Sequence, residues 1–162
     1  MKQFKSISLC LLGALLSGSL VTSCGKTPMN GKLDGEWIMQ GKYSKPSAEA
    51  AAYSEVTHPK LFWNVSLRLM TITGPDAYNT VSGLTSCRFV YEGNKLAITE
   101  AYLNDRGGYR DIPVTPEMEE ANARLRTFGL YSLPTHFRIH RLTSSEMILC
   151  SEMDSLVFRK RH

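Results

Sequence analysis

Alternation of apolar and polar residues runs through the chain from residue 33 onward and constrains its fold more than any other feature. The clearest example is the run 61–69, in which apolar residues at every second position are separated by Asn64, Ser66 and Arg68. Successive side chains of a β-strand point to opposite faces, so this period of two predicts a strand with one buried and one solvated face. We therefore expect an all-β domain.

Several further alternating runs are separated by short polar or glycine-containing turns, a spacing typical of antiparallel hairpins. They cover residues 36–43, 80–91, 95–103, 109–114, 136–142, 146–151 and 155–161. With the run 61–69 they predict about eight antiparallel strands in up-and-down order. An open sheet of this size has two exposed edges, so we expect a closed barrel, with a two-sheet sandwich as the alternative.

One segment departs from this period and predicts a short amphipathic helix. Thr115 suits the N-cap, Pro116 suits the first helical position, and Gly129 suits the end. The apolar positions that share one face are Met118, Ala121, Leu125 and Phe128. We expect this face to cover an end or a flank of the sheet. The alanine-rich segment 47–53 is expected to be either a helical turn or a loop.

The first 23 residues have the composition of a targeting segment. Lys2 and Lys5 precede an apolar stretch at 7–21, which is shorter than the roughly 20 apolar residues of a transmembrane helix. We therefore expect a cleaved signal peptide at 1–23. Residues 24–32 contain glycine, proline and polar residues without periodicity, which predicts a flexible tether before a barrel domain at 33–162.

The end of the targeting segment, Leu-Val-Thr-Ser-Cys at 20–24, resembles the lipobox of bacterial lipoproteins. The resemblance implies cleavage before Cys24 and lipid chains on Cys24, which would anchor the protein in a membrane. An ordinary secretory signal with a chance cysteine is the alternative. Acidic residues just after the lipidated cysteine direct some lipoproteins to the cell surface, and none occurs here before Asp34. We therefore expect an outer-membrane protein that faces the periplasm.

Cleavage also changes the net charge. The full chain has 19 Lys+Arg against 15 Asp+Glu, and loss of Lys2 and Lys5 leaves 17 against 15, a net charge of +2 instead of +4. Nucleic-acid binding requires a clustered basic face, and the dense basic run in this chain is confined to 159–161. We therefore expect no nucleic-acid partner.

Both ends of the barrel domain resemble lipocalins. Leu-Asp-Gly-Glu-Trp at 33–37 contains the Gly-x-Trp signature of the first lipocalin strand, and 156–161 resembles the last strand. The resemblance implies that Trp37 closes one end of the barrel and that Arg159 or Arg161 lies across it, a cation–π pair worth about 0.5–2 kcal/mol. The chain is thus similar to the lipocalin-like lipoproteins of bacteria over 33–161, although its helix precedes the last three strands.

An eight-stranded barrel is either filled by its own side chains or holds one small ligand. The expected ligand-lining positions are apolar with a few phenolic groups, and they are Trp63, Val65, Leu67, Phe89, Tyr91, Tyr102, Phe137 and Met147, with Ile98, Ile139 and Leu149 on the same inner face. Such a lining predicts a hydrophobic small molecule as ligand. The alternative is that these residues are simply the core.

The mature chain has no Gly-x-Ser-x-Gly motif, no glycine-rich phosphate loop and no His-Glu-x-x-His motif. His136 and His140 share a strand face but lie about 13 Å apart, too far to bind one metal ion together. We therefore expect neither enzymatic activity nor a cofactor. Cys87 and Cys150 predict either a structural disulfide, which an exported protein permits, or two buried thiols.

The leading functional hypothesis is a membrane-anchored protein that binds or carries a small hydrophobic molecule in the periplasm. The alternative is a protein-interaction or inhibitor module with a filled barrel and binding loops at 43–58 and 103–108. The barrel interior separates the two hypotheses. A cavity of about 300 Å³ or more favours ligand binding, whereas a filled interior with an exposed apolar loop favours a protein partner.

Overall fold

The computed structural model describes residues 28–47, 50–55, 61–74, 84–105 and 110–161. The expected signal peptide, the lipidation site Cys24 and the start of the tether lie outside these residues, so all three stay predictions. Parts of the two expected binding loops, 43–58 and 103–108, also lie outside them.

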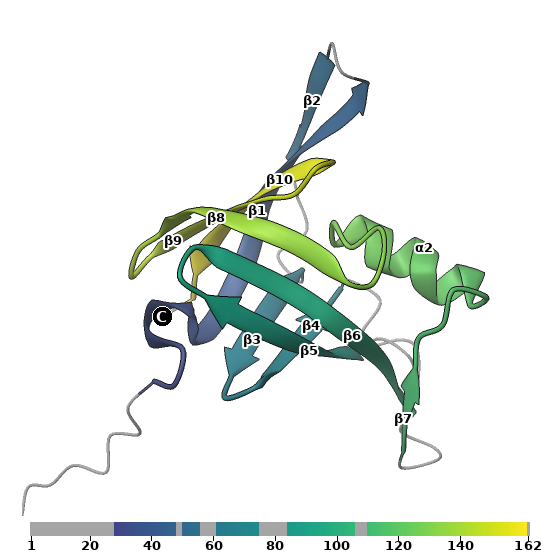
Figure 1. Ribbon diagram of the computed structural model, residues 1–162. Helices are drawn as coiled ribbons and strands as arrows, with labels where there is room; N and C mark the ends of the chain where they lie inside the picture. Colours follow the sequence, from purple (N-terminus) through teal and green to yellow (C-terminus); the bar gives the residue numbers. More distant parts are fainter. Residues whose placement is uncertain (1–27, 48–49, 56–60, 75–83, 106–109, 162) are drawn as a thin grey trace, which may run out of the picture.

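Eight antiparallel strands form a closed barrel (Figure 1). They are β1 (Gly35–Ser47), β3 (Phe62–Ser66), β4 (Leu69–Thr73), β5 (Leu84–Glu92), β6 (Lys95–Asp105), β8 (Thr135–Leu142), β9 (Glu146–Cys150) and β10 (Asp154–Lys160). Neighbouring strands pair in the order β10-β9-β8-β6-β5-β4-β3-β1, and β1 pairs with β10 to close the ring. The structure confirms the predicted up-and-down barrel.

The predicted number of barrel strands is right, but two of the eight predicted strands were misplaced. The run 61–69 is not one strand, because it turns at Leu67 and Arg68 and forms both β3 and β4. The alternation of apolar and polar residues continues through the turn and so concealed it. The run 109–114 contributes only β7 (Arg110–Pro113), which pairs with β6 outside the ring.

In the alanine-rich segment 47–53, the described residues 47 and 50–53 belong to strands and not to a helical turn or a loop. Much of it belongs to β2 (Ala50–Glu55), which pairs antiparallel with the second half of β1. Figure 1 shows the β1–β2 ribbon projecting beyond the barrel. Backbone hydrogen bonding to β1 therefore overrides the low strand propensity of alanine.

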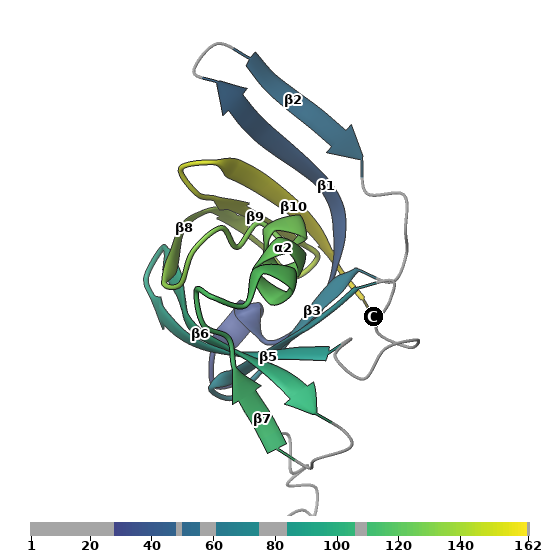
Figure 2. The same cartoon turned by 90° about the vertical axis from the view of Figure 1, so that its right-hand side faces the viewer.

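The predicted helix is α2 (Glu119–Thr127), and it covers the mouth of the barrel (Figure 2). Its N-cap position is Met118 rather than Thr115, so the helix begins later than expected. The side-chain amide of Asn122 donates to three carbonyl groups of the segment before the helix. No side chain caps the start of α2, and these bonds instead hold the preceding segment against its first turn. No helix of the described ranges is long and apolar enough to span a bilayer.

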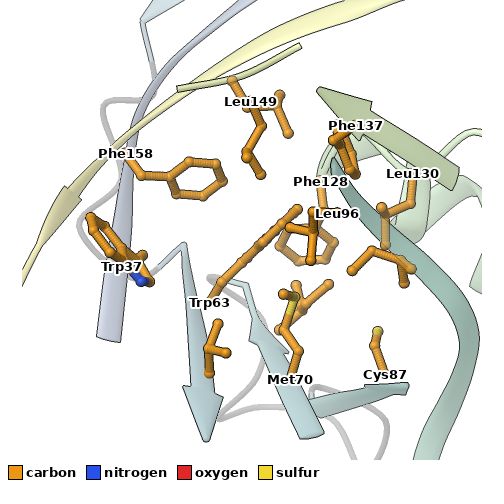
Figure 3. Packing of buried hydrophobic residues seen from close by; sticks show 14 of the residues in the cluster. Trp37, Trp63, Met70, Cys87, Leu96, Phe128, Leu130, Phe137, Leu149 and Phe158 are labelled. Carbon is orange, nitrogen blue, oxygen red and sulfur yellow. The ribbon is translucent and has the colours of Figure 1, made fainter. Parts of the chain in front are cut away.

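The interior of the barrel is a packed apolar core (Figure 3). The Trp63 ring lies at its centre, with its centroid 4.9 Å from that of Phe158 and 6.0 Å from that of Phe137. Phe128 and Leu130, which follow α2, enter the same core from the mouth. Burial of these apolar side chains stabilises the closed barrel and attaches the helix segment to it.

Candidate functional site

Most of the expected ligand-lining residues belong to this core. Trp63, Val65, Phe137 and Met147 are buried, as are Ile98 and Leu149, while Phe89, Tyr91 and Ile139 pack against them. Their inward orientation agrees with the sequence prediction. Because they pack on one another and on the segment that follows α2, they act as core in this structure.

Leu67 does not face the interior. It occupies the β3–β4 turn with a φ of 56° and is 60% exposed. The prediction is wrong because it continued the strand alternation through a turn, where side chains no longer point alternately in and out.

Tyr102 also points away from the core. The pairing of β5 with β6 shifts at Thr99, which is an extra residue on β6. One extra residue reverses the alternation along a strand, so Tyr102 does not share the inner face with Ile98. Its hydroxyl donates to the carboxylate of Glu100.

Trp37 closes the end of the barrel opposite α2. The side chain is fully buried, and its Nε1 donates to the carbonyl of Leu33 at 2.8 Å. Lys160 Nζ lies 4.9 Å from the centroid of the Trp37 ring and donates to the carbonyl of Lys32 at 3.0 Å. The resemblance to lipocalins thus predicted correctly that a basic side chain covers Trp37.

The identity of that basic side chain was predicted wrongly. Lys160 is the cross-strand partner of Trp37 and shares the inner face with buried Phe158. Arg159 is exposed on the outer face, and the Arg161 guanidinium pairs with Glu36 instead, at 3.3 Å. Because alternate residues of a strand share a face, the residue two positions after Phe158 reaches Trp37.

Cys87 and Cys150 are both free thiols, which agrees with the second of the two alternatives and not with the disulfide, although Cys150 is only partly buried. Cys87 is buried on the inner face of β5, and burial raises the pKa of its thiol to about 12. Cys150 is half-buried on the outer face of β9, with its Sγ 3.5 Å from Ser155 Oγ. A bridge does not form because one thiol points inward and the other outward.

A buried ion pair lies at the mouth of the barrel, next to the C-terminal end of α2. Lys42 Nζ is 3.0 Å from Asp154 Oδ2, and the Asp154 side chain is shielded from solvent. Lys42 Nζ also donates to the carbonyl of Arg126 at 3.1 Å and lies 5.1 Å from the ring centroid of Tyr131. Burial alone would lower the pKa of Lys42, but the contacts with Tyr131 and Asp154 outweigh it and raise that pKa.

Sequence reasoning missed this ion pair because a bulge turns Lys42 inward. Met39 pairs with Phe158 and Gly41 pairs with Val157, so Gln40 is an extra residue on β1. Without the bulge, the Lys42 side chain would point to the outer face of the barrel. Gly41, which directly follows Gln40, is a signal for a bulge that the sequence analysis did not use, since an isolated glycine within a strand pattern often marks one.

The outer face of the barrel carries a groove of about 580 Å³ that crosses β5, β6 and β8 and reaches the turn after β9. Its lining residues are Val90, Glu92, Asn94, Lys95, Leu96, Ala97, His136, Phe137, Arg138, Cys150, Ser151 and Glu152. Ala97 lies in the middle, because it pairs with Val90 on one side and with His136 on the other.

One end of the groove carries two cations. Lys95 and Arg138 are cross-strand partners on β6 and β8, and the salt bridges of the described residues involve neither of them. An apolar floor with unpaired cations at one end suits a small molecule with an apolar body and a polar or anionic group. Within the described parts of the chain, no cluster of His, Cys, Asp and Glu side chains could hold a metal ion.

Comparison with known proteins agrees with this architecture. A lipocalin-like protein from Bacteroides uniformis has a similar structure, with a TM-score of 0.54 and 16% identity over 81% of this chain and 100% of that chain. An uncharacterized protein from Bacteroides eggerthii is similar with a TM-score of 0.52 and 16% identity, over 79% and 98% of the two chains. At this identity the likeness concerns the fold alone.

A search of curated proteins gives no match. The family model of the lipocalin-like domain, however, matches residues 19–161, which is most of the chain. The closed eight-stranded barrel has the architecture that this family name describes. The chain therefore belongs to the lipocalin-like domain family.

Proposed function

We propose that this protein binds a small hydrophobic molecule and does so in the groove on the outer face of its barrel. The observation that carries the proposal is the size and lining of that groove, since about 580 Å³ lies within the range of roughly 300–1,000 Å³ typical of small-molecule sites. Membership of the lipocalin-like family supports a binding role in general. Because apolar side chains fill the lumen of the barrel, the groove is a better candidate than the lumen for the binding site.

The groove favours a ligand with an apolar body and an anionic end. Val90 and Ala97 would contact the apolar part, while Lys95 and Arg138 would bind the anion. Glu92 and Glu152 also line the groove, and these carboxylates disfavour a ligand with several negative charges. A long-chain carboxylate has the expected chemistry.

The proposal includes attachment to the periplasmic face of the outer membrane. Its support is the lipobox-like segment at 20–24, which the family match includes because that match begins at residue 19. Lipid chains on Cys24 would hold the barrel close to a source of hydrophobic molecules. The protein would then bind or carry such a molecule without changing it chemically.

A second candidate function is binding of a partner protein through the β1–β2 ribbon. In the described sheet β2 pairs with β1 alone, so its other edge has no neighbouring strand. The ribbon projects from the barrel in Figure 1. An exposed strand edge can add a strand from another chain, which is a recurrent mode of peptide recognition.

The small-molecule proposal is tested with a chain comprising residues 25–162. Native mass spectrometry and organic extraction of the purified protein should reveal a bound hydrophobic molecule. Binding of anilinonaphthalene sulfonate, which has an apolar body and an anionic group, should be competed by long-chain carboxylates. A protein that neither retains a molecule nor binds the probe would contradict the proposal and favour a partner protein.

A pair of variants tests the location of the ligand. Ala97→Glu places a bulky anion in the middle of the groove, and we expect about tenfold weaker probe binding, a loss of about 1.4 kcal/mol. His140→Glu adds the same group at an exposed position of β8 outside the groove and should leave binding unchanged. Equal binding by the two variants would exclude the groove as the site, even if the protein retains a ligand.

A further inference from the structure

A patch of exposed apolar and basic side chains lies where the described chain enters the barrel. The N-terminal patch consists of Met29, Leu67, Leu69, Arg68 and Arg88, which line a surface hollow of about 600 Å³. Met29, Leu67 and Leu69 are 59%, 60% and 39% exposed. We propose that this patch is the surface through which the anchored barrel contacts the membrane, with its apolar side chains in the interfacial layer and its arginines on lipid phosphates.

The inference rests on the lipid anchor proposed at Cys24 and follows from how the chain enters the barrel. Asn30 Nδ2 donates to the carbonyl of Leu67 at 2.7 Å, and the Asn30 N–H donates to Asp34 Oδ2 at 3.0 Å. The short helix η1 (Gly31–Leu33) follows directly. These bonds hold Met29, the neighbour of Asn30, beside the β3–β4 turn. Figure 1 shows η1 and this turn at the same end of the barrel.

The length of the chain limits how far this end can lie from the anchor. Four peptide links join Cys24 to Pro28, the first described residue, and they span at most about 14 Å when fully extended. A polar headgroup layer is about 5–8 Å thick on each side of a bilayer. If lipid chains hold Cys24 at the membrane, the N-terminal patch is therefore the part of the barrel that lies nearest to it.

The residue types of the patch match that environment. Leu67 adopts a φ of 56°, a conformation that favours glycine or asparagine, and yet its side chain is largely exposed. Neither turn conformation nor core packing accounts for a leucine at this position. Contact of exposed apolar side chains with the interfacial layer of a membrane does account for it.

Two cations complete the patch. Arg68 follows Leu67 in the turn, and Arg88 is the cross-strand partner of Leu69. The salt bridges of the described residues include neither arginine. Basic side chains next to apolar ones bind anionic headgroups while their aliphatic stems extend along the apolar surface.

The experiment uses the full chain, expressed with its own leader in a bacterial host. Incorporation of a palmitate analogue that depends on Cys24 tests the anchor first. The lipidated protein is then placed in vesicles of phosphatidylethanolamine and phosphatidylglycerol in equal parts, with a photoreactive diazirine on the lipid. We expect labelling of peptides that contain Met29, Leu67 or Leu69. Met153, which is 45% exposed in the turn between β9 and β10 at the opposite end, should stay unlabelled.

Matched variants make the result specific. The double variant Leu67→Asn, Leu69→Thr should lose most of the labelling and remain folded, because both leucines are exposed. Met153→Gln should label at the patch like the wild type. On anionic vesicles, the ratio of protein whose patch contacts the membrane to protein whose patch does not should fall about fivefold in Arg68→Gln and in Arg88→Gln.

The outcomes separate the inference from the proposal on which it rests. Absence of palmitate at Cys24 would refute the anchor and the membrane-facing patch with it. Lipidation without labelling of the patch, or with equal labelling of Met153, would refute the membrane contact of the patch alone. The proposed lipid anchor at Cys24 would then still be supported.

Discussion

At the scale of single residues, strand alternation decides which side chain covers Trp37. Counting in steps of two from buried Phe158 leads to Lys160, whereas Arg159 falls on the outer face. The sequence contained this signal, because Leu156 and Phe158 mark the inner face of β10. The prediction followed the resemblance to lipocalins, which specifies a basic side chain but not its position.

We predict that Lys160→Met lowers the free energy of unfolding by about 0.5–2 kcal/mol, because the ammonium group no longer lies over the Trp37 ring. Arg159→Met removes the same charge from an exposed position one residue away and should change the free energy by less than about 0.5 kcal/mol. Urea unfolding monitored by tryptophan fluorescence measures both. Equal effects of the two substitutions would show that the contact with Trp37 contributes no stability.

At the scale of elements, extra residues within strands account for several errors of the sequence prediction. Register shifts occur at Gln40 in β1, at Thr99 in β6 and at His140 in β8. Each shift exchanges the inner and outer faces of the rest of its strand, and so Lys42 turns inward and Tyr102 turns outward. The apolar face of α2 was predicted correctly, because the helical period has no interruption there.

The segment after α2 offers a test of how tightly this element is packed. Gly129 has a φ of 82°, and a Cβ built there would lie 2.9 Å from Cδ1 of buried Leu156. Gly93 has a φ of 58°, with nothing within 4 Å of such a Cβ. We predict that both Gly→Ala substitutions introduce backbone strain of about 1–3 kcal/mol and that Gly129→Ala loses about 1–3 kcal/mol more through overpacking.

Thermal unfolding and urea unfolding of the two glycine variants measure this difference. Because both substitutions share the unfavourable φ, the difference between them isolates the contact with Leu156. A Gly129→Ala protein as stable as Gly93→Ala would mean that the end of α2 adapts freely and does not close the mouth of the barrel tightly.

At the scale of the whole molecule, the first and last strands of the barrel meet at a seam, and the C-terminal end of α2 reaches this seam at the mouth of the barrel. The Lys42–Asp154 pair crosses this seam and also bonds the last turn of α2 through the Arg126 carbonyl. A buried charge without its partner is strongly destabilising, whereas loss of both charges is tolerated better. This ion pair therefore links closure of the barrel to docking of the helix.

We predict that Asp154→Ala lowers the free energy of unfolding by about 3–5 kcal/mol and that the double variant Lys42→Met, Asp154→Leu loses less. The pKa of Lys42 is raised above its ordinary value of 10.5 in the folded protein. The charged Lys42 side chain therefore makes its full contribution to the free energy of unfolding at neutral pH. This contribution is lost as the pH rises above 10.5 through the pKa of Lys42 in the folded protein.

Urea unfolding at neutral pH and at successively higher pH checks both statements. The difference in stability between the wild type and the double variant should stay constant at neutral pH and change only in the alkaline range. A difference that changes near pH 7, or an Asp154→Ala protein as stable as the wild type, would contradict the assigned role of the pair.

The sequence by itself determined the all-β class, the up-and-down strand order and the apolar face of α2. These features depend on local periodicity, which every strand or helix carries in its own residues. The tertiary structure alone decided where β3 turns into β4, which faces follow the bulges, how Lys42 meets Asp154, and which outer residues form the groove and the N-terminal patch. Continued alternation concealed the β3–β4 turn, whereas the other features depend on hydrogen-bond register between segments far apart in the chain, and one extra residue in a strand changes that register without altering the local pattern.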